Sequence, residues 1–465
     1  MRVIVISDLH IGCGPLEDFD VEIEQALVEF CAEVAADARS TEFVINGDFL
    51  DFVQAAPWQS PDLESESPDG VPLCFTEAQS LQKLENIFHA HQPTFYALAL
   101  LVASNSIRRL TIMPGNHDAD IFWPKVRSKL QERLSPAGGP ASDKISFHLE
   151  NEYHPPGFPG LWIEHGHQHD TCNSFAVRDI PYWSSGCPPI MKDKNKVERL
   201  IECVGTRFML KFMNGLDEKY TFVDNVKPFS KFVKMFLVSE FAPGFGPLKA
   251  LAAYWALLRF MAGRLAKQPG DLLSEEEAPS KLGEDLKRRL AAMTIYEIER
   301  LERRLQRDGF DTKGHPILSY IEIEEDGAEL LLDFLSRHPD ILDEVEADDI
   351  GMLSAGEKGF LTLGGGFIAN ETEALEDAAR KLVAAGLATG VIMGHTHEAV
   401  EAHAKLGYVN TGCWTRYFRA TPGKQPHSWK LLEKSAYQNF PYELAYAEIF
   451  ADDPGSLARK VFFPK

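Results

Sequence analysis

The chain has 465 residues, of which 45% are hydrophobic and 25% charged, and it carries a formal net charge of −22 at pH 7. These fractions are typical of a globular protein with a sizeable core, and they exclude an intrinsically disordered chain and a small disulfide-stapled fold. The negative charge argues against an extended nucleic-acid-binding surface, because such a surface needs clustered lysine and arginine.

The first part of the chain alternates short apolar runs with longer helical patterns, which predicts an α/β domain. Strands are expected over 3–6, 43–45, 110–113 and 161–163, and helices over 20–37, 77–105 and 119–134.

Beyond about residue 172 the pattern becomes mainly helical, with a clear helix over 295–307. A helix over 373–386 and a strand over 391–393 then restore the α/β pattern. We therefore predict one discontinuous domain, 1–172 and 385–465, that carries a large helical insert, 173–384.

The cysteines and the N-terminus predict a cytoplasmic protein. The 7 cysteines are odd in number and include no Cys-x-x-Cys pair, which suits a reducing compartment better than a disulfide framework or a zinc ribbon. The first apolar run, Val3 to Ile6, is shorter than the core of a secretory signal, which needs about 7 to 15 apolar residues. No uncharged apolar stretch reaches the roughly 18 residues of a membrane-spanning helix.

Five apolar runs end in polar residues that can bind a metal ion. They lead in turn to Asp8 and His10, to Asp48 and Asp51, to Asn116, His117 and Asp118, to His165 and His167, and to His395 and His397. In open α/β sheets, ligand sites gather beyond the carboxyl ends of the strands. Imidazole, carboxylate and amide donors without a thiolate suit Mn²⁺, Fe or Zn²⁺. There are too many donors for one tetrahedral ion, which indicates two metal ions that share a carboxylate.

The same residues lie in five blocks that resemble the signature of the calcineurin-like metallophosphoesterases, in the same order. The blocks are Ser7-Asp8-Leu9-His10, Gly47-Asp48-Phe49-Leu50-Asp51, Gly115-Asn116-His117-Asp118, His165-Gly166-His167 and Gly394-His395-Thr396-His397. The resemblance covers about residues 1–172 and 385–415. It implies a four-layer α/β/β/α sandwich with a dinuclear metal site, which hydrolyses a phosphate ester through a metal-bridged hydroxide.

The resemblance also implies a role for each residue. The ligands of the first metal ion would be Asp8, His10 and His397. The ligands of the second would be Asn116, His165 and His395, and Asp48 would bridge both ions. His117, oriented by Asp118, would stabilise the phosphoryl transition state or protonate the leaving group. Asp51 would hold ligands in place. In the fourth block either His165 or His167 can be the ligand, and His165 is favoured because the family's ligand commonly precedes a glycine.

The motif style is closest to bacterial phosphodiesterases and UDP-2,3-diacylglucosamine pyrophosphatases, although the latter commonly have arginine where this chain has His117. The chain lacks the Arg-Gly that follows the second aspartate in Ser/Thr protein phosphatases, which disfavours that role. We therefore predict a hydrolase that cleaves a phosphodiester or pyrophosphate bond with two divalent ions, first of all Mn²⁺. The alternatives are a metal-dependent nuclease of the same family and a catalytically silent scaffold that binds a partner through the insert.

The segment 229–265 of the insert is rich in Phe, Leu and Ala and carries several basic residues. It suits a lid that contacts lipid or a membrane surface. A core helix with a solvated basic edge is the plainer interpretation.

Overall fold

A computed structural model describes most of the chain. The described residues are 1–57, 65–136, 142–170, 172–177, 180–214, 225–227, 295–324, 326–338, 371–400, 407–419 and 440–464, with single positions between 286 and 341. The chain forms two compact units, one of Met1–Phe229, Asn370–Ala420 and Leu432–Lys465, the other of Ser230–Ala369 and Thr421–Leu431.

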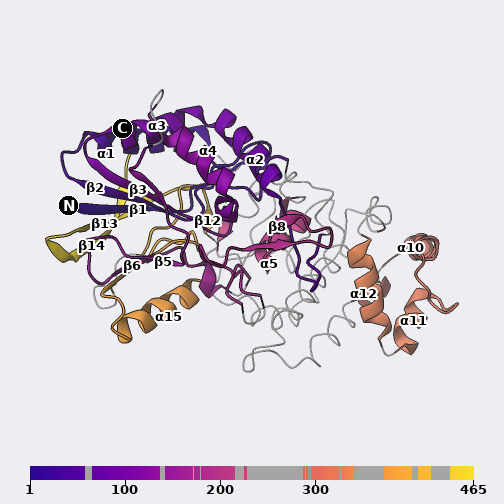
Figure 1. Ribbon diagram of the computed structural model, residues 1–465. Coiled ribbons are helices and arrows are strands. Elements are labelled where there is room, and N and C mark those ends of the chain that lie inside the picture. The colour runs from indigo at the N-terminus through magenta and orange to yellow at the C-terminus, as the bar shows by residue number, and fades with distance from the viewer. Residues whose placement is uncertain are drawn as a thin grey trace. The chain divides into compact units, whose positions relative to one another are not determined.

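Two β-sheets form the centre of the first unit (Figure 1). The six-stranded sheet has the order β14 (Asp453–Phe462), β13 (Leu444–Phe450), β1 (Arg2–Ile6), β2 (Thr41–Asn46), β3 (Ile107–Met113) and β4 (Ile145–Phe147). The four-stranded sheet has the order β11 (Tyr408–Asn410), β10 (Gly390–Met393), β6 (Leu161–Glu164) and β5 (Glu152–Tyr153). Strands β1 to β4 are parallel to one another, as are β6, β10 and β11.

The inner faces of the two sheets pack against each other. Alternate residues of β1 point to opposite faces, so that Val3 and Val5 lie in a core shared with Ile163 and Ile392 of the other sheet. Ile4 and Ile6 point outward, into the helix-covered core. Because the central strands are buried on both faces, they contain short apolar runs such as Val3–Ile6 and Phe43–Ile45.

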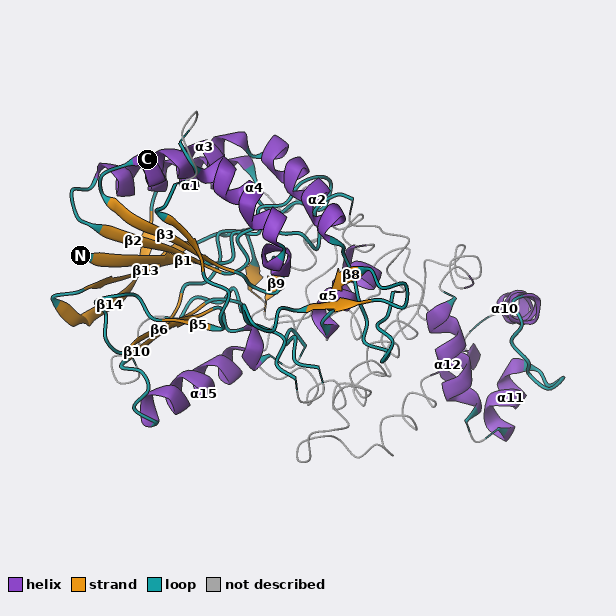
Figure 2. Cartoon of the chain, viewed as in Figure 1, coloured by secondary structure: helices purple, strands orange, loops and turns teal. Residues whose placement is uncertain are grey.

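Helices cover both outer faces (Figure 2). Those on the six-stranded sheet are α1 (Val21–Ala36), α2 (Glu77–Ala90), α3 (Gln92–Ala103) and α4 (Pro124–Leu134). On the four-stranded sheet, α15 (Glu371–Ala384) places Leu375 and Ala379 against Val391 and Tyr408. The layers are helix, sheet, sheet and helix, which confirms the predicted α/β/β/α sandwich.

Two predicted helices were too long, in each case because of a proline. The expected helix 77–105 is divided at His91 into α2 and α3, with Pro93 in the first turn of α3. The expected helix 119–134 is divided into η1 (Ala119–Phe122) and α4, which begins at Pro124. Proline has no N–H to donate and is tolerated only in the first turn of a helix.

Part of the predicted helical insert belongs to the first unit and contains short strands. It follows η2 (His167–His169) and comprises β7 (Ile190–Lys192), β8 (Glu198–Leu200), α5 (Val204–Phe208), η3 (Met209–Met213) and β9 (Val226–Lys227). Strand β9 pairs with β12 (Phe418–Arg419). The Leu200 amide donates to Phe75 O over 2.9 Å, and the Cys74 amide donates to Leu200 O over the same distance. The first unit is interrupted between Phe229 and Asn370 by the longer segment of the second unit. The division into 1–172, 173–384 and 385–465 stays a prediction.

The described part of the second unit contains α10 (Ile295–Arg307), α11 (Ile317–Ile323) and α12 (Gly327–Arg337). Buried residues of these helices include Leu301, Tyr320 and Leu331. The predicted helix 295–307 is confirmed, and 229–265 lies outside the described residues. Within the described part of the chain, every helix is too short or too polar to cross a lipid bilayer.

An imidazole and two carboxylates tie the loop after β1 to the helices. His91 lies between Glu17 of that loop and Glu24 of α1, with His91 Nδ1 3.2 Å from Glu24 Oε1 and a hydrogen bond from Nε2 to Glu17. Burial alone would lower the pKa of His91, but the two carboxylates outweigh burial and raise the pKa to about 9.

We expect the free energy of unfolding to fall as the pH rises from about 6.5, the ordinary pKa of histidine, to about 9. In this window the folded chain holds a proton on His91 that the unfolded chain has lost, so the contribution is complete below the window and absent above it. Urea titrations across this pH range should show a weaker dependence in His91→Gln. His89→Gln, which alters an exposed histidine two positions away, should behave as the wild type, and an unchanged pH dependence in His91→Gln would contradict the assignment.

Candidate metal centre

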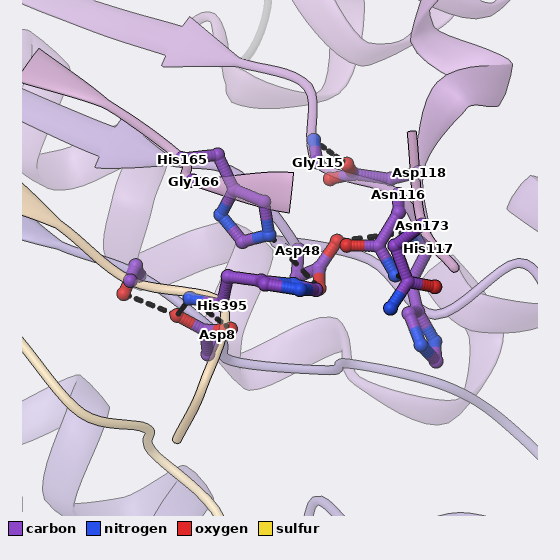
Figure 3. A network of polar contacts seen from close by, with 12 residues as sticks. Asp8, Asp48, Gly115, Asn116, His117, Asp118, His165, Gly166, Asn173 and His395 are labelled. Atoms are coloured by element: carbon purple, nitrogen blue, oxygen red, sulfur yellow. Dashed lines mark hydrogen bonds and ion pairs between the residues drawn. The ribbon is translucent and has the colours of Figure 1, made fainter. Parts of the chain in front are cut away.

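Five strand ends bring the predicted side chains together in the first unit, several of which are drawn in Figure 3. The six-stranded sheet supplies Asp8 and His10 after β1, Asp48 and Asp51 after β2, and Asn116, His117 and Asp118 after β3. The four-stranded sheet supplies His165 after β6, and His395 and His397 after β10. All are buried except His117, which is partly exposed. The fold therefore makes neighbours of residues as distant in sequence as Asp8 and His395, which are 387 positions apart.

One group of donors consists of Asp8, His10 and His397, and one ligand atom of each lies within 4.8 Å of the others. His10 Nε2 lies 2.9 Å from His397 Nε2, which lies 3.5 Å from Asp8 Oδ1. Asp51 Oδ2 lies 3.0 Å from His10 Nδ1, so the proton of this imidazole belongs on Nδ1 and the Nε2 lone pair faces the group. Two imidazole nitrogens at this separation need a proton or a cation between them.

A second group consists of Asp48, His165 and His395, whose ligand atoms also lie within 4.8 Å of one another. His165 Nε2 lies 3.2 Å from Asp48 Oδ2, and the same oxygen lies 3.7 Å from His10 Nε2. Figure 3 shows the rings of His165 and His395 reaching toward Asp48. Asp48 is thus close to both groups, as a bridging carboxylate must be.

The backbone is strained where these side chains converge. Of the seven non-glycine residues with positive φ in the described part of the chain, five are predicted ligands: Asp8, His10, Asp48, His395 and His397. Positive φ is uncommon outside glycine, and it persists only where the surrounding structure enforces it. The strain therefore marks a functional site.

Close approach of two loops requires glycine at two positions. A Cβ atom on Gly115 would collide with Asp48 Oδ1, and one on Gly394 would collide with Asp8 Oδ2. The absence of a side chain lets the loops after β3 and β10 pass directly against the carboxylates.

The donors fit a cation. Asn116 Oδ1 is buried without a hydrogen-bond partner, a costly arrangement that native proteins rarely leave uncompensated. The Nδ1–H of His165 donates to Asn46 O over 2.9 Å, which leaves Nε2 facing Asp48. A divalent ion beside Asp48 would engage the amide oxygen and the imidazole nitrogen together.

The pKa values of the buried acids and histidines also indicate a cation site. Burial alone would raise the pKa of Asp48, but His165 and His117 outweigh burial and hold it well below the ordinary value. Burial and the charge of Asp48 raise the pKa of Asp8. Burial would lower the pKa of His165, yet Asp48 and Asp8 raise it to about 9. The two carboxylates therefore attract positive charge, which a divalent cation can supply in place of the proton.

The expected orientation of His117 by Asp118 is corrected by the structure. The carboxylate beside His117 Nδ1 is that of Asp51, whose Oδ2 lies 2.9 Å away. Asp118 instead accepts from the backbone amides of Phe49, at 2.8 Å, and Gly115, at 2.5 Å. It holds the loops after β2 and β3 together, and its burial raises its pKa well above the ordinary value.

The position of His167 favours His165 as the ligand of the fourth block. The ring centroid of His167 lies 4.2 Å from that of Trp183, in an aromatic cluster with Phe175. Burial and the charge of His165 hold the pKa of His167 well below the ordinary value. His167 is thus a neutral packing residue, while His165 faces Asp48.

The sequence did not lead us to include a sixth strand end, that of β11, in the site. After β11, Thr411 Oγ1 lies 2.6 Å from Ser7 Oγ, and Ser7 also bonds the Asp8 carboxylate. Asn410 Nδ2 donates to Gly394 O over 2.8 Å. These residues connect the first and fifth blocks. The signal was the same as at the other strand ends, an apolar run followed by Asn410-Thr411-Gly412.

Comparison with known proteins agrees with this geometry. Residues 1–196 match the model of the calcineurin-like phosphoesterase family. These residues form a calcineurin-like phosphoesterase domain. No curated protein and no solved structure matches the chain. Membership and the two donor groups together make this phosphoesterase a metal-dependent hydrolase of phosphate esters.

We expect Asp51→Asn to weaken Mn²⁺ binding by about 10- to 100-fold, because the variant loses the carboxylate that fixes the His10 ring. Calorimetric titration of the metal-free protein measures this. Asp120→Asn is the matched control, since Asp120 is a buried acid of the same unit that bonds Ser80 and lies outside both donor groups. Equal Mn²⁺ affinity in Asp51→Asn and the wild type would contradict the role of Asp51.

Proposed function

We propose that this phosphoesterase cleaves phosphodiester or pyrophosphate bonds with two divalent cations, most simply Mn²⁺. The observation that carries the proposal is the place of the Asp48 carboxylate, within 3.7 Å of His10 Nε2 and 3.2 Å of His165 Nε2. Asp8, His10 and His397 would hold one cation, and Asn116, His165 and His395 the other, with Asp48 shared. When bound, such a pair activates water and neutralises the phosphoryl group that is attacked.

His117 would act on the substrate itself. It is 17% exposed, more than Asp51, which is 2% exposed. Asp51 accepts from Nδ1, so Nε2 is the nitrogen that can exchange a proton with the leaving group. The His117 amide also donates to Asp48 Oδ1 over 2.8 Å, which ties the position of the acid to the bridging carboxylate.

The preference for diesters rests on the sequence around these residues. Phe52 and Val53 follow Asp51, where protein phosphatases have Arg-Gly, and Asp118 replaces their glutamate. A silent scaffold is disfavoured because every predicted ligand and His117 are present together. The proposed lid or lipid contact of 229–265 and a cytoplasmic location remain predictions from the sequence.

Hydrolysis of bis-p-nitrophenyl phosphate and p-nitrophenyl phosphate, compared in chelator-stripped and Mn²⁺-loaded protein, tests the proposal. We expect Mn²⁺-dependent turnover with the diester preferred. His117→Ala should lower kcat by about 10²- to 10⁴-fold, the usual contribution of a general acid, while Mn²⁺ remains bound.

Asp48→Asn should lose both turnover and bound Mn²⁺, and His154→Ala, at an exposed histidine of the same unit, should change neither. Monoester preference would overturn the diester assignment. Turnover that survives in both His117→Ala and Asp48→Asn would overturn the site.

A further inference from the structure

Asp170 lies outside the five sequence blocks, in the loop that follows η2, yet its carboxylate is directed into the metal centre. Its side chain is 10% exposed. Asp170 Oδ1 accepts from the Cys172 amide over 2.8 Å, and Oδ2 accepts from Asn173 Nδ2 over 2.6 Å. These two bonds fix the carboxylate from its own loop.

The fixed carboxylate meets a predicted ligand. Asp170 Oδ2 lies 3.1 Å from His395 Nε2. His395 is held at its other end too, because its backbone amide donates to Asp8 Oδ2 over 3.0 Å. A proton on Nε2, donated to Asp170, leaves the lone pair of His395 on Nδ1 for a cation.

Competition for Asp170 from the nearby His169 is avoided. His169 Nε2 bonds Glu164 Oε1 over 2.7 Å, and Gln168 Nε2 donates to Glu164 Oε2 over 2.8 Å. A separate acid, Glu164, therefore binds the side chains of Gln168 and His169, and Asp170 binds His395.

The same loop reaches a second predicted ligand. Asn173 Oδ1 lies 3.5 Å from Asn116 Nδ2, and Figure 3 shows Asn173 and Asn116 side by side. A Cβ atom on Gly205, at the start of α5, would collide with Asn173 Oδ1, so glycine makes room for this side chain. With Asn116 Nδ2 engaged, the unpartnered Oδ1 is the atom left for a cation.

We propose that Asp170 and Asn173 are positioning residues that hold His395 and Asn116 in the orientation required by the second cation. The proposal rests on the proposed function and deepens it, because it assigns the affinity of the second cation site to a loop outside the five sequence blocks. Carboxylates that receive the second N–H of a metal-binding histidine fix its tautomer and ring orientation. Their loss typically lowers metal affinity by about 10- to 100-fold.

Mn²⁺ binding to the metal-free protein, followed by calorimetry and by electron paramagnetic resonance, tests the proposal without a substrate. The wild type should bind two Mn²⁺ and give the signal of a spin-coupled pair. Asp170→Asn keeps the shape of the side chain, and it should weaken only the second binding event, by about 10- to 100-fold. When two equivalents of Mn²⁺ are added, one more than fills the first site, Asp170→Asn should show the signal of an isolated Mn²⁺ and not that of a coupled pair.

Asn173→Ala should shift the second binding event in the same direction by a smaller factor, and it provides the test if Asp170→Asn fails to fold. Asp193→Asn is the matched control. Asp193 holds the turn between β7 and β8, where it accepts from the amides of Asn195 and Val197. The Asp193→Asn variant should bind two Mn²⁺ as the wild type does.

A coupled pair with wild-type affinity in both Asp170→Asn and Asn173→Ala would overturn this inference and leave the proposed function intact. Equal weakening of both binding events would also overturn it. A wild type that binds no Mn²⁺ would overturn the proposed function together with it.

Discussion

The buried charge of Asp48 is the constraint on which the rest of the site depends. A carboxylate removed from water is stable as an anion only where positive charge or hydrogen bonds compensate for its lost hydration. In this chain the compensation comes from His165 and His117, together with the His117 amide. Each partner comes from a different strand end, so the charge can be stabilised only when both sheets are assembled.

The sandwich supplies the rigidity that this arrangement needs. Residues such as Val5 and Ile392 pack the inner faces of the sheets together, and this packing holds the loops after the strands in place. The left-handed backbone of Asp8, Asp48 and His395 is unfavourable by itself. The free energy of burying the apolar core offsets that cost, and the side chains are thereby directed inward before any ion binds.

The fold and most of the candidate site could be predicted from the sequence because their signals are local. Strands buried on both faces appear as short, mostly apolar runs, and the polar residues that follow them are one to five positions away along the chain. The divided helices were missed because the helical period continues through Pro93 and Pro124, and the break depends on the missing amide of one residue. Asp118 was assigned to His117 as its neighbour in the sequence, whereas the partner across space is Asp51.

Asp170 shows the limit of sequence-based prediction more clearly. Nothing in its own segment indicates a link to His395, which is 225 positions away. The contact arises only when β6 and β10 pair in parallel and set their following loops side by side. Such supporting residues depend on the tertiary arrangement of turns, for which no short-range pattern exists.

Diffraction at the manganese absorption edge, from crystals of the wild-type chain soaked in Mn²⁺, tests the central claim most directly. The account predicts two anomalous peaks, both within bonding distance of the Asp48 carboxylate, one toward His10 and the other toward His165. No peak beside Asp48, or a single peak that Asp48 does not contact, would contradict it.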